Sequence, residues 1–303
     1  LGISLLIIIL LFTGNDPNQI IITVGVFAAA AFRLTPSVNR VASTVGGIRF
    51  SLAALNTLNK LLTAPIKYNV QNKYKKIENF NQIIVDNLGF NYSSSKTKVL
   101  KNININIKKN QTIGIIGPSG SGKSTFLDLF LGLLEPSSGA IFLDNQNIKD
   151  LGRTWQSNIG YVPQEIFMID DSISQNIAFG VPIYEIDEKR IQNAIKLAQL
   201  EGFISELPNG LNTVIGERGA RVSGGQRQRI GIARALYHDP EIIIFDEATS
   251  SLDDDTEKQL MKSVSNLYGN KTIIIISHRQ STVEDCDYIY KLKNGTVEKI
   301  FNK

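Results

Sequence analysis

The chain has few cysteines, few histidines and little net charge, and each shortage limits the class of protein to which it can belong. Its 303 residues include one cysteine, Cys286, so no internal disulfide can form, which is typical of cytosolic domains. The net charge is only +4, and no long basic run or basic stretch interleaved with aromatic residues is present. This pattern does not favour a nucleic-acid partner. Internal repeats and low-complexity tracts of note are also lacking.

Charge is scarce in the first third of the chain and mixed elsewhere, which indicates two regions. The apolar run 2–12 has neither a basic leader nor a small-residue cleavage site, so we do not expect a signal peptide. We expect the run to be the tail of a transmembrane helix that begins upstream, in an N-terminally truncated chain. A polar loop at 13–19 then leads to a second apolar run at 20–32.

The positive charges beyond this loop predict the orientation of the chain in a membrane. The loop has no Lys or Arg, whereas Arg33, Arg40, Arg49 and Lys60 follow it. By the positive-inside rule, the loop lies outside the membrane and the region that follows is cytoplasmic. We expect the membrane to be a plasma (bacterial inner) membrane that the whole protein crosses several times. The run 20–32 would span only ~20 Å as a helix, short of the ~30 Å hydrocarbon core, so the helix must continue past Arg33.

This last membrane helix is expected to extend into the cytosol. Residues 38–62 contain no strong breaker apart from Gly46 and Gly47, and their apolar side chains recur at an approximately helical spacing. We expect the helix to end at Pro65. The predicted regions are the end of a membrane domain at 1–64, a linker at 65–78 and a catalytic domain at 79–303.

Arg33 and Arg40 are candidates for contact with an anionic substrate. They are seven positions apart, close to two helical turns, so both guanidinium groups lie on one side of the helix. Charges inside a membrane normally face a protein interior or a wet cavity, and arginine suits phosphate oxygens. We expect both to line a cavity that attracts an anionic, phosphate-bearing amphiphile. The alternative, nearly as well supported, is that both snorkel to the cytosolic interface.

The segment 117–125 matches the phosphate-binding pattern G-x-x-x-x-G-K-[ST]. Its glycines allow consecutive N–H groups to turn around an anion at the start of a helix, while Lys123 reaches the β- and γ-phosphates and Ser124 holds Mg²⁺. The flanks agree, with a short apolar strand at 112–116 and a helix at 124–134 stopped by Pro136. The residues expected around ATP are Gly117, Ser119, Gly120, Ser121, Gly122, Lys123, Ser124 and Thr125.

Two further apolar runs deliver catalytic side chains. The run 241–245 is followed by Asp246, assigned to Mg²⁺, and by Glu247, assigned to polarising the water that attacks the γ-phosphate. Taken alone, this acidic pair could instead cap the next helix. The run 272–276 places His278 at the same edge of a parallel sheet, where it can bond the γ-phosphate or the water. The other histidine, His238, is expected at the surface.

The order of these motifs resembles the nucleotide-binding domain of ABC transporters, over about residues 79–303. The segments that carry the resemblance are GPSGSGKST, YVPQ at 161–164, VSGGQRQR at 222–229, IIIFDEATS at 242–250, SLD at 251–253 and His278. The resemblance implies an α/β P-loop fold with a helical subdomain at about 165–236, in which Gln164 senses Mg²⁺ and the γ-phosphate. It also implies that 250–253 connects the two active sites, with Asp253 at the nucleotide. Tyr92 matches the aromatic residue that stacks on adenine, the alternative being an ordinary strand aromatic facing the core.

The segment VSGGQ explains why one domain alone should be inactive. It precedes an expected helix at 226–236, so its hydroxyl and open N–H groups form an anion site at a helix start. In the family, two domains pair head to tail, and each ATP is held between the phosphate loop of one and this signature of the other. The signature residues expected at the nucleotide are Ser223, Gly224, Gly225 and Gln226, although a glycine turn with a serine cap is the structural alternative. Because both halves of the site are intact, we expect a homodimer.

The function predicted from these features is ATP-driven export. The direct fusion of apolar helices to the ATPase is similar to exporters, whereas importer ATPases usually lack a fused membrane domain. The stretch 26–40 resembles bacterial lipid-linked oligosaccharide flippases more closely than drug or peptide exporters. We therefore expect an ATP- and Mg²⁺-dependent flippase that moves a lipid-linked sugar or similar amphiphile. A multidrug, lipid or peptide exporter is the alternative, and a soluble ABC ATPase acting on nucleic acid fits less well.

Overall fold

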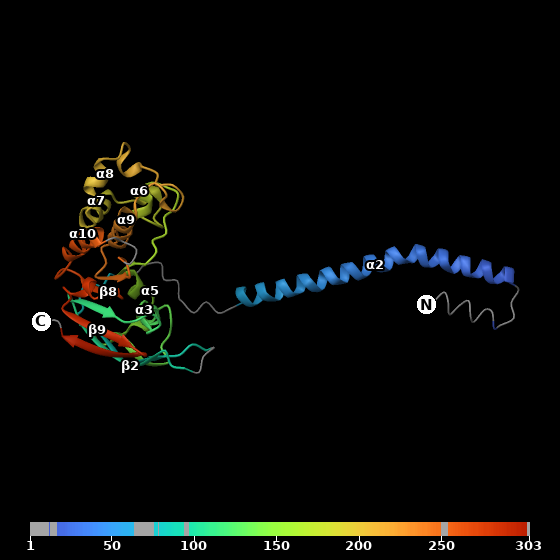
Figure 1. The fold of residues 1–303 in the computed structure, drawn as a ribbon, viewed down its shortest axis with the longest axis horizontal. Helices are drawn as coiled ribbons and strands as arrows, with labels where there is room; N and C mark the ends of the chain where they lie inside the picture. The colour runs from blue at the N-terminus through green and yellow to red at the C-terminus, as the bar shows by residue number, and fades with distance from the viewer. Residues whose placement is uncertain are drawn as a thin grey trace. The chain divides into compact units, whose positions relative to one another are not determined.

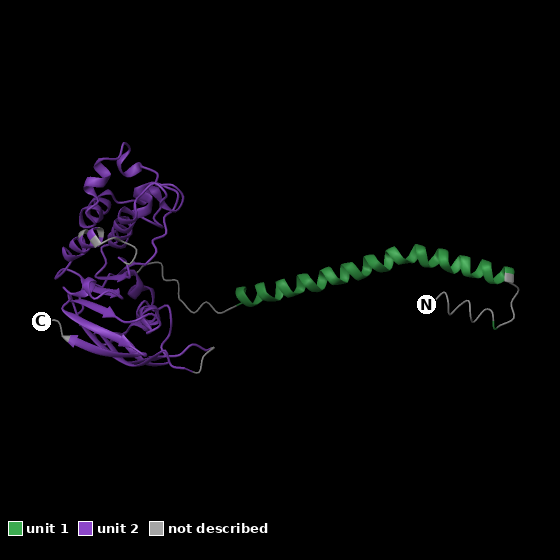
Figure 2. Ribbon diagram, viewed as in Figure 1, with its two compact units in different colours: residues 1–70 green, residues 71–303 purple. Residues whose placement is uncertain are grey.

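The computed structural model describes residues 12, 17–63, 76–77, 79–93, 97–249 and 254–301. The chain separates into two units, residues 1–70 and 71–303, shown in different colours in Figure 2. Each unit is a separate structural body and is described by itself. The expected first membrane helix and polar loop fall mostly outside the described residues, as do most of the linker and the segment 250–253.

The first unit is dominated by one long helix, α2 (Pro17–Leu62), of 46 residues. It is the only helix of the described residues that is long and apolar enough to cross a membrane, with a mean hydropathy of 1.7. The prediction that the helix continues past Arg33 is confirmed. The helix passes through Pro36, which has no N–H to donate to the carbonyl of Phe32, and it ends at Leu62, ahead of Pro65.

The second unit contains a six-stranded sheet in the order β10-β9-β3-β8-β7-β6, in which all neighbours are parallel except the β9–β10 pair. Its strands are β3 (Thr112–Ile116), β6 (Ile159–Val162), β7 (Ile242–Asp246), β8 (Thr272–Ser277), β9 (Tyr288–Lys293) and β10 (Thr296–Phe301). The central strands are nearly continuous runs of isoleucine because both faces of the sheet are covered. Alternate residues enter different cores: Ile243 and Phe245 pack on one face, Ile242 and Ile244 on the other.

A smaller antiparallel sheet covers one of these faces, in the order β2-β1-β4-β5. Its strands are β1 (Gln82–Phe90), β2 (Leu100–Lys108), β4 (Ser138–Leu143) and β5 (Gln146–Asn147). Buried and exposed residues alternate along much of β2, as expected for a sheet with one wet face. Its buried side chains share a core with Phe126 and Phe130 of α3 and with Trp155, so the helix that follows the phosphate loop is held between the two sheets.

The remaining helices follow the chain between and after the strands. They are α3 (Lys123–Phe130), α4 (Ile148–Leu151), α5 (Arg153–Ser157), α6 (Ile173–Ile177), α7 (Glu188–Leu197), α8 (Glu201–Ser205), α9 (Gly224–Leu236) and α10 (Asp254–Ser265), with 3-10 turns η1 (Ile183–Glu185), η2 (Gly210–Asn212), η3 (Glu217–Gly219) and η4 (Ser281–Val283). Figure 1 shows α6 to α9 gathered together beyond the sheets. The predicted α/β fold with helical segments is confirmed.

One predicted helix is shorter than expected. The sequence predicts a helix at 124–134 that Pro136 stops, but α3 ends at Phe130. Gly132 adopts a left-handed φ of 70°, which turns the chain out of the helix. Glycine adopts this conformation without the steric penalty that a side chain would cause. The stop is therefore set by a glycine four residues ahead of the proline.

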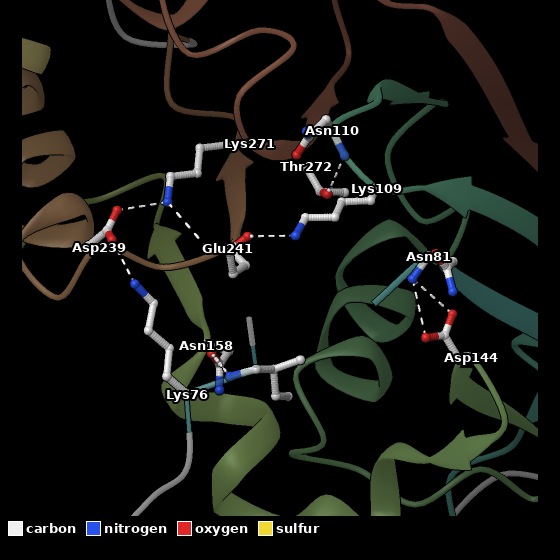
Figure 3. Close-up of polar contacts among 11 residues, drawn as sticks. Lys76, Asn81, Lys109, Asn110, Asp144, Asn158, Asp239, Glu241, Lys271 and Thr272 are labelled. Carbon is white, nitrogen blue, oxygen red and sulfur yellow. Dashed lines mark hydrogen bonds and ion pairs between the residues drawn. The ribbon is translucent and has the colours of Figure 1, made fainter. Parts of the chain in front are cut away.

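A group of polar contacts ties the start of the second unit to the amino ends of the parallel strands (Figure 3). Asp239 forms ion pairs of 2.7 Å with both Lys76 and Lys271. The N–H of Ile77 donates to Oδ1 of Asn158, which directly precedes β6. Because these residues precede the strands, the contacts lie at the sheet edge opposite to the one where the strands end.

Candidate nucleotide-binding site

The carboxyl ends of β3, β7 and β8 bring most of the predicted nucleotide residues to one cavity of about 490 Å³. Ligand sites of open parallel sheets lie at this edge. Its lining comprises Val99, Ser119, Gly120, Gly122, Lys123, Ser124, Thr125, Gln164, Asp246, Glu247 and His278. Sequence reasoning missed Val99, which precedes β2 and belongs to no motif that could have signalled it.

The phosphate loop has the features of an anion cradle. Gly120 and Gly122 adopt positive φ angles of 75° and 106°, and a Cβ built on Gly117 would lie 2.3 Å from the carbonyl oxygen of Leu292. Ser121 is 5% exposed, and within the described part of the chain its Oγ has no hydrogen-bond partner. The N-cap of α3, Gly122, has no side-chain cap, so the N–H groups of the first turn point to the loop. A phosphate group fits this set of donors.

Lys123 places a cation at the base of the cavity. It is 8% exposed, and its Nζ donates to the carbonyl oxygens of Gly117, at 2.8 Å, and Pro118, at 3.3 Å. The same Nζ lies 3.6 Å from Oε1 of Glu247. The ammonium group is thus held between the loop and the carboxylate, in a position where it can neutralise charge on a phosphate.

Glu247 is held in a strained backbone conformation. Its φ is 47°, in the left-handed region that residues other than glycine rarely adopt. Its N–H donates to the carbonyl of Ile276 on β8 at 2.9 Å. Such a conformation costs about 1–3 kcal/mol, and strained residues of this kind cluster at functional sites. The carboxylate lies 3.6 Å from Nδ1 of His278, so the end of β7 and the end of β8 supply two facing groups.

Asp246 has an unpredicted partner in Tyr161, whose hydroxyl donates to Oδ2 of the carboxylate at 3.1 Å. Burial raises the pKa of Asp246, as does the charge of Glu247, whereas the hydrogen bond from Tyr161 opposes this rise. Burial and the charge of Asp246 raise the pKa of Tyr161, so the hydroxyl keeps its proton and donates. The sequence signal was present, because Tyr161 opens the YVPQ motif, but the motif does not show that the ring reaches the next strand.

Tyr92 stands beside the helix that follows the phosphate loop. Its hydroxyl lies 3.2 Å from Oγ1 of Thr125, and its ring meets the ring of Phe90 edge to face, with centroids 4.9 Å apart. The residue is 41% exposed, in contrast to the alternative of a strand aromatic facing the core. The exposed part of the ring can accept a flat base.

The signature residues lie at the start of α9 and are not part of the lining described for the cavity. Oγ of Ser223 accepts a hydrogen bond from the N–H of Gln226 at 3.2 Å, and Oε1 of Gln226 accepts one from the N–H of Ser223 at 2.8 Å. This is a capping box, so the structural alternative is present. The capping box does not prevent Ser223 from donating a hydrogen bond to a phosphate, because the cap uses an oxygen lone pair and leaves the hydroxyl hydrogen available.

The remaining candidates lie elsewhere. Arg33 and Arg40 are exposed on α2 in the first unit, while Asp253 is outside the described residues. His238, expected at the surface, is exposed. Three or more His, Cys, Asp or Glu side chains do not converge into a metal site anywhere in the described residues, so a metal here would need oxygen ligands of other kinds, such as Ser124 and Gln164 beside Asp246.

Comparison with known proteins identifies similar chains. Residues 100–250 match the ABC transporter family. The chain is 35% identical to an ATP-dependent lipid A-core flippase from Saccharophagus degradans. The match covers the whole of this chain and 50% of the length of that protein. It is 39% identical to the leukotoxin translocation ATP-binding protein LktB of Mannheimia glucosida, over 80% of this chain and 34% of that one.

Among solved structures, a bacterial Atm1-family ABC exporter with ATP bound is similar, with a TM-score of 0.72 and 32% identity over 93% of this chain and 49% of that chain. The chain therefore spans about half or less of the length of these proteins.

Proposed function

Because this chain belongs to the ABC transporter family, we propose that it is the ATP-hydrolysing half of a membrane exporter of flippase type. The observation that carries the ATPase role is the meeting of Lys123, Glu247 and His278 in one cavity, with 3.6 Å between Nζ of Lys123 and Glu247 and 3.6 Å between Glu247 and Nδ1 of His278. A base, a cation and a hydrogen-bonding imidazole beside a phosphate cradle are what attack of water on a γ-phosphate requires.

Each of these residues has one task in the proposed reaction. The loop N–H groups and Lys123 bind the phosphates of ATP and fix their position. Glu247 accepts a proton from the attacking water, and His278 orients that water or donates to the γ-phosphate. Tyr92 stacks on the adenine ring. The rate enhancement arises because the reacting groups are held in position and the charged side chains are already in place before the reaction begins.

A magnesium ion is proposed to accompany the nucleotide. Ser124, Gln164 and Asp246 all line the cavity and present the oxygen ligands that Mg²⁺ prefers. When bound, the ion neutralises charge on the β- and γ-phosphates. Tyr161 supports this arrangement, because its hydrogen bond favours the ionised form of Asp246, the form that can bind a cation.

We further propose that two copies of the protein work head to tail. The signature from Ser223 to Gln226 presents the N-terminus of the 13-residue helix α9, a ready anion site, yet it is not in the lining of the cavity that holds the phosphate loop. A second copy would bring its signature to this cavity, with Asp253 nearby. Both halves of the site carry the residues needed for turnover, which favours a homodimer.

The transported molecule is proposed to be an amphiphile with a phosphate-bearing headgroup, such as a lipid-linked oligosaccharide. Relatives named for flipping lipid A-core support a lipid substrate, and Arg33 and Arg40 on α2 offer paired guanidinium groups to an anion. The alternative of a drug or peptide exporter has its support in the relative named for leukotoxin translocation. In either case α2 crosses the membrane, in a multi-pass inner-membrane protein with its ATPase domain in the cytoplasm.

The ATPase proposal is tested by Glu247→Gln in the full-length protein in lipid nanodiscs. We expect ATP turnover to fall by about two orders of magnitude or more, since removal of a general base costs that much, while ATP still binds. Glu201→Gln, at an exposed carboxylate on α8, is the matched control and should turn over ATP normally. Unchanged turnover in Glu247→Gln would refute the proposed catalytic role.

The substrate proposal is tested separately by stimulation of ATPase activity. Lipid-linked oligosaccharide should stimulate the full-length protein, and Arg33→Gln with Arg40→Gln should abolish that stimulation without lowering basal turnover. Stimulation by a peptide or drug alone would favour the second exporter class. Stimulation by the lipid-linked sugar that survives both substitutions would mean that the two arginines only anchor the helix at the interface.

A further inference from the structure

One buried carboxylate outside the nucleotide cavity ties together the segments that leave β7 and β8. Glu257 lies on α10 and is 8% exposed. Its Oε1 accepts hydrogen bonds from Oγ1 of Thr249 at 2.9 Å and from Oγ1 of Thr282 at 2.8 Å. Its Oε2 accepts one from Nη1 of Arg279 at 2.7 Å. One side chain on α10 thus joins the segment after β7 to the segment after β8.

The donors are neighbours of the proposed catalytic pair. Thr249 is two residues beyond Glu247, and Arg279 directly follows His278. Arg279 is fixed further by its N–H, which donates to Oγ of Ser277 at 2.9 Å. The carboxylate therefore lies between the two segments that carry Glu247 and His278, whose side chains face each other across 3.6 Å.

We propose that Glu257 is a positioning residue, which sets the separation of Glu247 and His278 by tying Thr249 to Arg279. This inference rests on the proposed ATPase function. Glu257 is not among the described residues that line the nucleotide cavity. It borders instead a separate groove of about 540 Å³ beside α10 and η4. Its effect on the reaction is therefore transmitted through its hydrogen-bond partners.

The charge of Glu257 makes the tie strong and sensitive to substitution. Burial alone would raise the pKa of this carboxyl, but the hydrogen bonds from Thr282, Thr249 and Arg279 outweigh it, and the pKa lies below its usual value. The group is thus ionised at neutral pH, and its bonds are charge-assisted. Glutamine in its place would keep one oxygen for the threonines but present an NH₂ group to Arg279, which has no acceptor to offer.

The first test is Glu257→Gln in the full-length protein, with steady-state ATPase kinetics. We expect kcat to fall about ten- to a hundred-fold, because small displacements of catalytic groups cost rate on that scale. The KM for ATP should change by less than about two-fold, since the binding residues stay in place. Glu201→Gln serves again as the matched control. Unchanged kcat, or an equal loss of kcat and ATP affinity, would overturn the positioning role.

A second pair of variants keeps the test informative even if Glu257→Gln folds poorly. Thr249→Val removes one hydrogen bond to the carboxylate while preserving shape, and Thr249→Ser preserves the hydroxyl but removes a methyl group. If the hydrogen bond positions the loop, valine should lower kcat at unchanged KM and serine should restore it. If packing alone matters, serine will be the more damaging change, and the proposal fails.

Failure of this inference can be told apart from failure of the proposed function. Glu247→Gln should be inactive whatever Glu257 does. An inactive Glu247→Gln protein with fully active Glu257→Gln and Thr249→Val proteins would reject the positioning role alone. An active Glu247→Gln protein would instead reject the catalytic role of Glu247 on which the inference depends.

Discussion

Nζ of Lys123 lies 3.6 Å from Oε1 of Glu247, although the two residues follow different strands, β3 and β7, that are not neighbours in the sheet. The lysine is 8% exposed, so its charge is little screened by water. In the reaction proposed above, the lysine contacts the γ-phosphate and the glutamate accepts the proton of the attacking water. Charge on the lysine therefore matters to phosphate binding, and charge on the glutamate to proton transfer.

Replacing Lys123 by methionine should abolish ATP turnover and weaken nucleotide binding. Methionine keeps much of the buried volume but removes the cation, so Glu247 loses its counter-charge and a phosphate loses a donor. We expect at least a hundred-fold loss of kcat/KM for ATP, the scale seen when one charge-stabilising group is removed. ATPase kinetics and binding of a fluorescent ATP analogue measure the two effects, and wild-type affinity in the variant would contradict the assigned contact.

Alanine at Gly117 should be more damaging than alanine at Gly120, although both belong to the phosphate loop. A Cβ at Gly117 would lie 2.3 Å from the backbone oxygen of Leu292, which cannot move without distorting β9. At Gly120 the new atom meets nothing within 4 Å, and only the φ of 75° imposes a cost, about 1–2 kcal/mol. Thermal unfolding and ATP affinity of the two variants should show this order, and the reverse order would refute the cause given.

Replacing Tyr161 by phenylalanine should shift the acid limb of the ATPase pH profile toward neutral pH. The hydroxyl donates to Asp246 and lowers the pKa of a carboxyl that burial already raises. Without it the pKa rises further, so Asp246 becomes protonated, and unable to bind a cation, at a higher pH than in the unmodified protein. The variant should also need more Mg²⁺ for half-maximal rate. A profile that does not move would show that Asp246 is not the group that titrates.

Acid should destabilise the catalytic unit partly through Glu257. The pKa of this carboxyl is lower in the folded protein than its usual 4.5, so its contribution is fully present above the unfolded value and is lost as pH falls through the folded one. The thermal midpoint of the unmodified protein should therefore fall more steeply below about pH 4.5 than that of Glu257→Gln. Parallel curves for the two proteins would show that the carboxyl is not depressed.

The ion pairs of Asp239 should contribute little by comparison. Asp239 has 55% of its side-chain surface accessible, and its partners Lys76 and Lys271 have 44% and 14%, so water reaches the carboxylate of both pairs. Exposed pairs contribute roughly 0–1 kcal/mol and weaken with salt. Asp239→Asn should thus lower the thermal midpoint only slightly at low salt, and by less at high salt. A large loss that salt does not reduce would indicate a role for this cluster beyond a surface ion pair.

The sequence predicted the parts of the site that are written in contiguous motifs. The phosphate loop, the acidic pair at the end of β7 and the histidine after β8 were predicted at one sheet edge, because apolar runs mark buried strands and ligands bind where parallel strands end. The order of the motifs resembled the ABC transporter family and implied its α/β fold. The thickness of a membrane required the long helix past Arg33. The prediction for the end of α3 was wrong. Pro136 is the more conspicuous stop signal in the sequence, but the left-handed turn at Gly132 ends the helix earlier.

Contacts between strands and loops that are distant in sequence were decided only by the tertiary structure. The bond from Tyr161 to Asp246 depends on β6 and β7 being neighbours in the sheet, and the place of Val99 beside the phosphate loop depends on the second sheet. Glu257 looks like any helical acid in the sequence, yet burial forces its carboxylate to find partners, and the fold supplies Thr249, Thr282 and Arg279. Local patterns specify which groups are present, whereas packing specifies which of them meet.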